Sequence, residues 1–137
     1  MIDDNIQKIE DSRVPKGRID LIGVGRLGLR IGINLMQAHR GGPKVIGAFD
    51  GQKVAGGDII FTLLGAEIGE YKTDFLERIC THDEEFRKVE SHSQYVGDDN
   101  LDLVEGDVVI LILAGGNTIP TAAKIIRHAH ERGALTI

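Results

Sequence analysis

Three glycines and one aspartate have the spacing of a nucleotide-binding loop. Gly23, Gly25 and Gly28 follow the pattern G-x-G-x-x-G. In this pattern the first glycine permits a tight turn, the second lets the backbone approach a phosphate, and the third lets a helix pack closely on a strand. Asp50 stands 22 residues after Gly28, where a carboxylate can accept both hydroxyls of a ribose. The pattern predicts nucleotide binding; the alternative is a glycine turn that only packs helix on strand.

The neighbouring segments predict the strand–loop–helix context that such a site needs. The apolar run over Arg18–Val24 predicts a short buried strand, and Gly25–His39 has the apolar spacing of a helix. Lys44–Phe49 predicts a second strand, which ends at Asp50. The amino terminus of the expected helix would offer free N–H groups and a partial positive charge to an anion.

The rest of the chain continues the alternation of helices and strands. We expect helices over Asp58–Ala66 and Glu70–Cys80, a third strand over Phe86–Glu90, a helical turn over Leu101–Val104, a central strand over Asp107–Ala114, a helix over Asn117–Arg132 and a last strand over Ala134–Ile137. Strands that alternate with helices imply right-handed crossovers. The sequence therefore predicts an α/β fold, a Rossmann-like, doubly wound, mainly parallel sheet with helices on both faces.

We expect residues 1–137 to form a single Rossmann-like nucleotide-binding domain, with residues 1–16 as a weakly amphipathic N-terminal helix or arm. The chain ends on the first residues of an expected strand. This predicts either a truncated domain or one that normally continues past Ile137.

Composition narrows the function classes. The 137 residues carry a net charge of −5, which disfavours nucleic acid and anionic membrane as partners. The longest apolar run, Val108–Ala114, is far shorter than the ~20 residues of a membrane helix. Cys80 is the single cysteine, so an intramolecular disulfide is excluded and a reducing, cytoplasmic compartment is expected.

From about Arg13 to Ile137 the sequence resembles the ThiF/MoeB/HesA family, the adenylating proteins related to ubiquitin-activating enzymes. Residues 22–30 (IGVGRLGLR) are similar to the family's glycine loop, and residues 49–54 (FDGQKV) to its D-x-D-x-V signature. Residues 67–72 (EIGEYK) resemble I-G-x-x-K, whose lysine contacts the nucleotide phosphates and corresponds to Lys72. This last match is the most specific, because ordinary dinucleotide dehydrogenases have no reason to carry it.

Three positions depart from the family pattern. Gln52 replaces the family's second aspartate after strand two, and Phe61 replaces an arginine that neutralises ATP phosphate charge. Gly116 falls where the family has an aspartate that helps to hold magnesium. The resemblance therefore implies a divergent member with the scaffold kept and part of the adenylation chemistry lost.

Other residues extend the candidate site. Arg26 and Leu27 lie within the glycine loop; Arg26 could supply the missing positive charge or be a solvated loop residue. Gly115 and Asn117 follow the central strand, where doubly wound sheets bind ligands, although Asn117 could instead cap the next helix. No metal site is expected, because His128 and His130 would point about 200° apart around a helix.

The resemblance implies that Gly23, Gly25, Gly28, Asp50 and Lys72 bind ATP, with Mg²⁺, and that a small carboxylate or a carrier protein is activated as an acyl-adenylate within a homodimer. The catalytic residues are unknown, because no acid, base or nucleophile is identified. Two alternatives stay open. One is an NAD-binding dehydrogenase-like domain, since Asp50 would repel the 2′-phosphate of NADP. The other is a non-catalytic nucleotide-binding or partner subunit.

Overall fold

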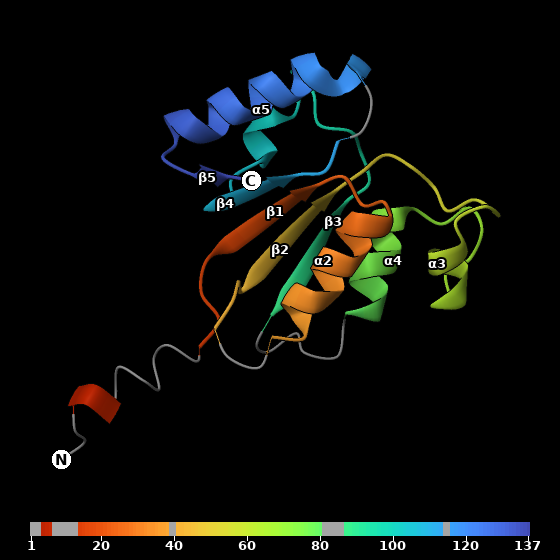
Figure 1. Ribbon diagram of the computed structural model, residues 1–137, viewed down its shortest axis with the longest axis horizontal. Helices are drawn as coiled ribbons and strands as arrows, with labels where there is room; N and C mark the ends of the chain where they lie inside the picture. The colour runs from red at the N-terminus through yellow and green to blue at the C-terminus, as the bar shows by residue number, and fades with distance from the viewer. Residues whose placement is uncertain (1–3, 7–13, 39–40, 81–86, 114–115) are drawn as a thin grey trace.

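The computed structural model describes residues 4–6, 14–38, 41–80, 87–113 and 116–137. Five parallel strands form one sheet in the order β3-β2-β1-β4-β5 (Figure 1). The strands are β1 (Arg18–Ile22), β2 (Val45–Phe49), β3 (Lys88–His92), β4 (Val108–Leu111) and β5 (Leu135–Thr136). The chain moves outward from β1 to β3 and then returns to the other side of β1. The switch point of the sheet therefore lies between β1 and β4, where doubly wound folds bind their ligands.

Helices cover both faces of the sheet. The helices are α2 (Arg26–Met36), α3 (Ile59–Leu63), α4 (Lys72–Ile79) and α5 (Ile119–Glu131), with 3₁₀ turns η2 (Leu101–Leu103) and η3 (Gly116–Thr118). Figure 1 shows α2 and α4 side by side on one face and α5 on the other. This arrangement confirms the predicted Rossmann-like α/β fold.

Each face has its own apolar core. Alternate residues of β1 supply both, because successive side chains of a strand point to opposite faces. Leu21 packs with Leu29 of α2 and Phe75 of α4 in one core. Ile22 packs with Phe49 of β2 and Ile125 of α5 in the other. Both residues of β1 are at most 2% exposed, so this strand is the centre of the domain.

β1 also contains a buried carboxylate that fixes the turn before β4. Asp20 accepts hydrogen bonds from the backbone N–H groups of Glu105 (2.9 Å) and Gly106 (2.7 Å). Arg18 donates through Nε to the same carboxylate at 2.8 Å. Burial raises the pKa of Asp20, although Arg18 opposes this shift. These bonds tie the turn that enters β4 to β1 and so set where β4 runs beside it.

The boundaries of the predicted elements agree with the structure to within a few residues. β3 runs to His92, two residues beyond the predicted end at Glu90, and Phe86 lies outside the described residues. β4 ends at Leu111, and Ala114 of its predicted range is also outside them. Of the predicted N-terminal helix, residues 4–6 are helical, residues 14–16 are not, and the others lie outside the described residues.

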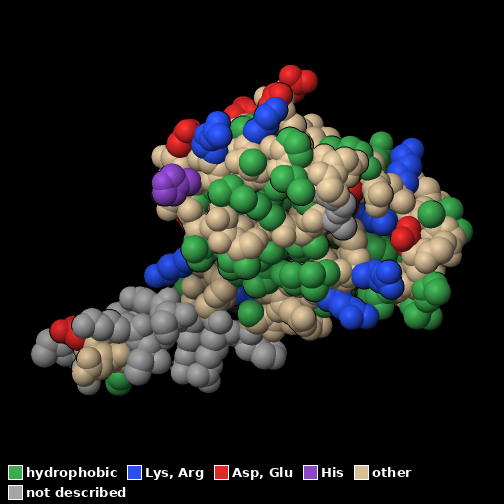
Figure 2. All heavy atoms as spheres, turned by 45° about the horizontal axis from the view of Figure 1, so that its top comes forward, with side chains coloured by type: hydrophobic (Ala, Val, Ile, Leu, Met, Phe, Trp, Pro, Cys, Tyr) green, Lys and Arg blue, Asp and Glu red, His purple; other side chains and the backbone are tan. Residues whose placement is uncertain are grey.

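Exposed apolar side chains lie on several parts of the described surface, and hydrophobic side chains are green in Figure 2. Ile59, Leu63, Leu64 and Ile68 lie on α3 and the turn after it; Ile119, Ile126, Leu135 and Ile137 lie on or beside α5 and β5. Among the described helices, none has the length and apolar character needed to cross a bilayer.

Candidate functional site

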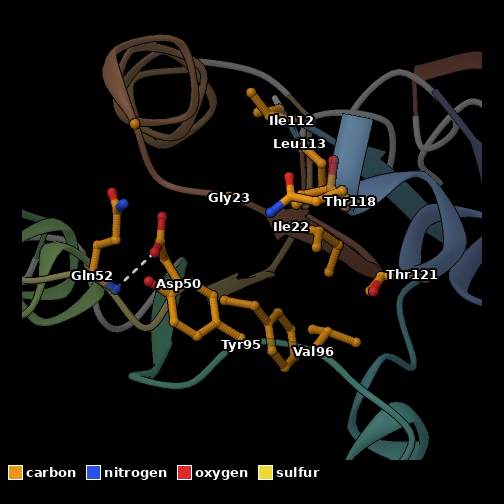
Figure 3. A pocket seen from close by; sticks show the side chains of 13 residues that line it. Ile22, Gly23, Asp50, Gln52, Tyr95, Val96, Ile112, Leu113, Thr118 and Thr121 are labelled. Carbon is orange, nitrogen blue, oxygen red and sulfur yellow. Dashed lines mark hydrogen bonds between the residues drawn. The ribbon is translucent and has the colours of Figure 1, made fainter. Parts of the chain in front are cut away.

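A cavity of about 550 Å³ opens at the carboxyl ends of the strands, at the switch point of the sheet. This volume lies within the range of small-molecule sites in proteins. Ile22, Phe49, Val96, Ile112 and Leu113 form its apolar walls. Its polar side chains are Asp50, Gln52, Tyr95, Asn117, Thr118 and Thr121 (Figure 3). The sheet thus gathers residues from four separate loops around one space.

Two of the three loop glycines are required by the packing of the fold itself. Gly23 has φ = +108°, and a Cβ there would lie 2.3 Å from the carbonyl oxygen of Ile112. A Cβ on Gly28 would lie 2.2 Å from the carbonyl oxygen of Gly23. These distances confirm that the loop folds as the sequence predicts, with a tight turn first and a close helix–strand contact last.

Gly25 differs from both neighbours. A Cβ built on it meets no described atom within 4 Å, and its φ of −87° suits any residue. Gly25 is the N-cap residue of α2 and lines the cavity. The described chain therefore gives no packing reason for a glycine here, whereas a ligand that contacts this backbone would.

Asp50 connects the end of β2 to the glycine loop. Its Oδ2 accepts a hydrogen bond from the N–H of Val24 (2.8 Å), and its Oδ1 accepts one from the N–H of Gln52 (2.8 Å). The residue is 9% exposed and lines the cavity. Each oxygen keeps a second lone pair, so the carboxylate can still accept a ligand hydroxyl. Besides the predicted ribose contact, Asp50 thus has a structural role in shaping the loop.

Lys72, the first residue of α4, is buried next to the cavity but is not one of the described residues that line it. Its ammonium donates to Oε1 of Gln52 at 3.0 Å and lies 3.4 Å from Oδ1 of Asp58. The N–H of Ala55 and the charge of Lys72 lower the pKa of Asp58, even though desolvation opposes them. The structure therefore places Lys72 behind Gln52 instead of directly in the cavity wall.

Of the other residues predicted for the site, some line the cavity and others do not. Asn117 lines the cavity. Arg26 and Leu27 are exposed on the first turn of α2 and, like Gly28, are not among the described lining residues. The charge of Arg26 nevertheless contributes to the lowered pKa of Asp58. Gly115 lies outside the described residues.

Phe61 explains one departure from the family pattern. It is fully buried, and its ring centroid lies 5.7 Å from that of Phe75. The Lys72 ammonium lies 5.3 Å from the centre of the Phe61 ring, within cation–π range. The position therefore belongs to the core between α3 and α4, where an arginine would bury an additional charge.

The sequence analysis missed the cavity wall that follows β3. Tyr95 is 64% exposed and lines the cavity together with Val96. Its ring lies against Gly51, where an added Cβ would be 2.5 Å from Cε2 of the tyrosine. Asn100 fixes this loop by donating to the carbonyl of Tyr95 at 2.9 Å. The sequence analysis ended the third strand at Glu90. Had it extended this strand to His92, it would have placed the loop of Tyr95 and Val96 at the carboxyl ends of the strands, where the cavity lies.

Cys80, His128 and His130 are not among the described residues that line the cavity. Burial raises the pKa of the Cys80 thiol to about 11, so the thiol is a weak nucleophile near neutral pH. His128 approaches the carbonyl of Val104 through Nε2 at 3.0 Å, which is a packing contact of α5. Among the described residues, no group of three or more His, Cys, Asp or Glu side chains is arranged to hold a metal ion.

Comparison with known proteins gives one curated relative and several solved structures. No family model matches the chain. The uncharacterized protein MJ0693 of Methanocaldococcus jannaschii is 41% identical over 133 residues, which cover 97% of this chain and 53% of the relative. HcgE from Methanothermobacter marburgensis, in a structure bound to guanylylpyridinol and ATP, is 51% identical with a TM-score of 0.86. That match covers 91% of this chain and 60% of HcgE.

Two more distant structures have the same fold. The tRNA N6-threonylcarbamoyladenosine dehydratase TcdA of E. coli, in complex with ATP, has a TM-score of 0.73 at 18% identity over 95% of this chain and 52% of its own. MccB of E. coli with ATP has a TM-score of 0.73 at 15% identity over 96% of this chain and 38% of its own. The chain has the same ThiF-like α/β fold as these proteins. It spans a little over half the length of MJ0693 and of HcgE.

Proposed function

We propose that this ThiF-like domain binds ATP in the cavity at the carboxyl edge of its sheet. The supporting observation is the open space over Gly25 beside the Asp50 carboxylate, in a chain 51% identical to the ATP-bound HcgE. The ribose would lie at Asp50, and the phosphates over Gly25 and the amino terminus of α2, where free N–H groups favour anions. The base would lie against the apolar wall that includes Val96.

The proposed reaction is the activation of a carboxylate by ATP. A carboxylate oxygen attacks the α-phosphorus of ATP, and the bond from that phosphorus to the oxygen that bridges it to the β-phosphate breaks. Pyrophosphate leaves, and an acyl-adenylate is formed. A carboxylate is already ionised near neutral pH, so this step requires no general base. The chain's contribution would be electrostatic, because the backbone amides of the glycine loop and the Lys72 ammonium stabilise the charge that develops on the phosphates.

Magnesium does not fit the donors of the described residues well. Gly116 stands where the family resemblance implies a carboxylate, and both oxygens of Asp50 already accept backbone hydrogen bonds. Mg²⁺ in nucleotide sites needs one or two carboxylates besides phosphates and waters. We therefore assign no step of the reaction to a metal ion.

The first substrate to test is guanylylpyridinol, because the structure of HcgE contains it together with ATP. A small carboxylate or a carrier protein is the broader substrate class. The ThiF-like domain covers 60% of HcgE, so the second ligand could also contact residues outside this domain in the whole protein. The NAD alternative is not favoured, because HcgE, TcdA and MccB are solved with ATP.

Calorimetric titration with Mg·ATP, with NAD in parallel, tests the proposal. We expect micromolar ATP binding that is weakened at least tenfold by Asp50→Ala and by Lys72→Ala. Lys44→Ala is the matched control. Lys44 is exposed and directly precedes β2, so it lies at the amino ends of the strands, whereas the cavity lies at their carboxyl ends. Binding of NAD alone would refute the proposal. ATP binding without pyrophosphate release in the presence of guanylylpyridinol would favour a non-catalytic nucleotide-binding subunit.

We also propose that the domain forms a homodimer through the apolar surface on α3 (Figure 2). Ile59 and Leu63 are 66% and 76% exposed there, four residues apart on the helix, and exposed apolar patches mark protein contact sites. Light scattering should give twice the chain mass, and Leu63→Glu should reduce it to the monomer mass. A monomer at all concentrations would contradict this proposal.

A further inference from the structure

Gln52 connects the two charged residues of the proposed ATP site. Its backbone N–H donates to Oδ1 of Asp50 at 2.8 Å, a contact drawn in Figure 3. Its side-chain oxygen accepts a hydrogen bond from the Lys72 ammonium at 3.0 Å, and its carbonyl accepts one from the Lys72 N–H at 3.0 Å. Gln52 lines the cavity, whereas Lys72 lies behind it. The orientation of the lysine ammonium relative to a ligand in the cavity therefore depends on this glutamine.

The charges around the Lys72 ammonium are close to balanced. The residue is 6% exposed, and within the described part of the chain its acceptors are Oε1 of Gln52 and the Asp58 carboxylate. Oδ2 of Asp58 is bound by the N–H of Ala55 at 2.8 Å. An ammonium has three N–H donors, so two protein acceptors leave one donor for a ligand oxygen.

The neutral amide at position 52 decides whether that donor is useful. An acidic residue there would give the ammonium a second carboxylate, and the cluster of Lys72, Asp58 and residue 52 would become net negative. A negative cluster repels phosphates, and the repulsion is strong at the short distances and reduced dielectric of a partly buried site. A glutamine side chain has nearly the same length as a glutamate side chain, and it forms hydrogen bonds without adding a charge.

We infer that Gln52 is a positioning residue, which orients the Lys72 ammonium toward the phosphates of a bound nucleotide and leaves its charge uncompensated by a second carboxylate. This inference rests on the proposed function, because it concerns the same ATP site. The role that we infer for Gln52 concerns the phosphates of the nucleotide and not its ribose. Changes at Gln52 should therefore affect ATP much more than a nucleoside that lacks phosphates.

The test compares ATP, AMP and adenosine binding by calorimetry in the wild type and in Gln52→Glu, which has nearly the same shape. We expect Gln52→Glu to weaken ATP binding at least tenfold, to weaken AMP binding less, and to change adenosine binding less than threefold. Gln37→Glu is the matched control for the added negative charge, because Gln37 is exposed at the far end of α2. It should leave all three affinities within twofold.

A double-mutant cycle tests whether the effect passes through the lysine. Gln52→Met removes the hydrogen bond to the ammonium without adding charge, and it should weaken ATP binding severalfold; it also provides the readout if Gln52→Glu fails to fold. In a Lys72→Met background, Gln52→Met should lose most of this effect, because the ammonium that the glutamine positions is gone. Equal losses for ATP and adenosine, or a full effect of Gln52→Met in the Lys72→Met background, would overturn the inference.

The outcomes also separate this inference from the proposed function. A wild-type protein that binds no ATP would refute the proposed function, and the inference with it. A wild type that binds ATP, together with Gln52→Glu and Gln52→Met variants of unchanged affinity, would refute only the role of Gln52.

Discussion

Substitution of Gly25 by alanine separates ligand binding from folding at the glycine loop. A Cβ at this position meets no described atom within 4 Å, and the backbone φ of −87° suits an L-amino acid. Alanine restricts the unfolded chain, which stabilises a protein by about 0.4–1 kcal/mol at a compatible position. Gly25 is also an N-cap, where alanine is poorer than glycine by a similar amount. We expect the free energy of unfolding to stay within about 0.5 kcal/mol.

The same methyl group would occupy space that the proposed phosphates need. Steric intrusion into a packed contact costs about 1–3 kcal/mol, which corresponds to a loss of roughly 5- to 150-fold in affinity. With ATP at 100 times the wild-type Kd, binding stabilises the wild type by about 2.7 kcal/mol. A variant with a 30-fold higher Kd would gain only about 0.9 kcal/mol from the same ATP concentration.

Thermal unfolding with and without ATP measures both quantities in one experiment. For a domain of this size the wild-type Tm should rise by about 10 °C with ATP, and the Tm of Gly25→Ala by about 3 °C. Gly23→Ala and Gly28→Ala are the controls, because their added Cβ atoms would lie 2.3 and 2.2 Å from backbone oxygens. The free energy of unfolding of both variants should fall by about 2–5 kcal/mol even in the absence of ligand. A full ATP-dependent shift in Gly25→Ala would refute the phosphate placement.

Three further predictions follow from single contacts. Asp50→Asn places an amide NH₂ group against the N–H of Val24 or Gln52, which removes one hydrogen bond. The free energy of unfolding, measured with denaturant and without ligand, should therefore fall by about 1–3 kcal/mol. Unchanged stability would contradict the loop contact. The pKa of Asp58 is lowered by the Ala55 N–H and by Lys72, so its stabilisation is complete above its unfolded pKa of about 3.9 and is lost as pH falls through the folded value. The stability difference between wild type and Asp58→Asn should therefore shrink below about pH 4, and a constant difference would contradict this. Burial raises the pKa of Cys80 to about 11, so a thiol reagent at pH 8 should react slowly with the native protein and quickly in denaturant; equal rates would show an accessible thiolate.

The sequence alone determined the fold class and the glycine loop. Apolar runs such as that of β4 and the helical spacing of α2 are local patterns, which depend only on neighbouring residues. The requirement for glycine at positions 23 and 28 is also nearly local, because it follows from one turn and the helix that it opens. Asp50 could be placed because it directly follows a recognisable strand.

Only the tertiary structure decided how the site is assembled. The contact of Gln52 with Lys72 crosses 20 residues of sequence and depends on how α4 packs behind β2. The wall formed by Tyr95 and Val96 depends on where β3 ends, and the predicted strand ended too early to indicate it. The physical reason is that a parallel sheet brings the carboxyl ends of distant strands to one edge, while strand register and helix packing decide which side chains meet there.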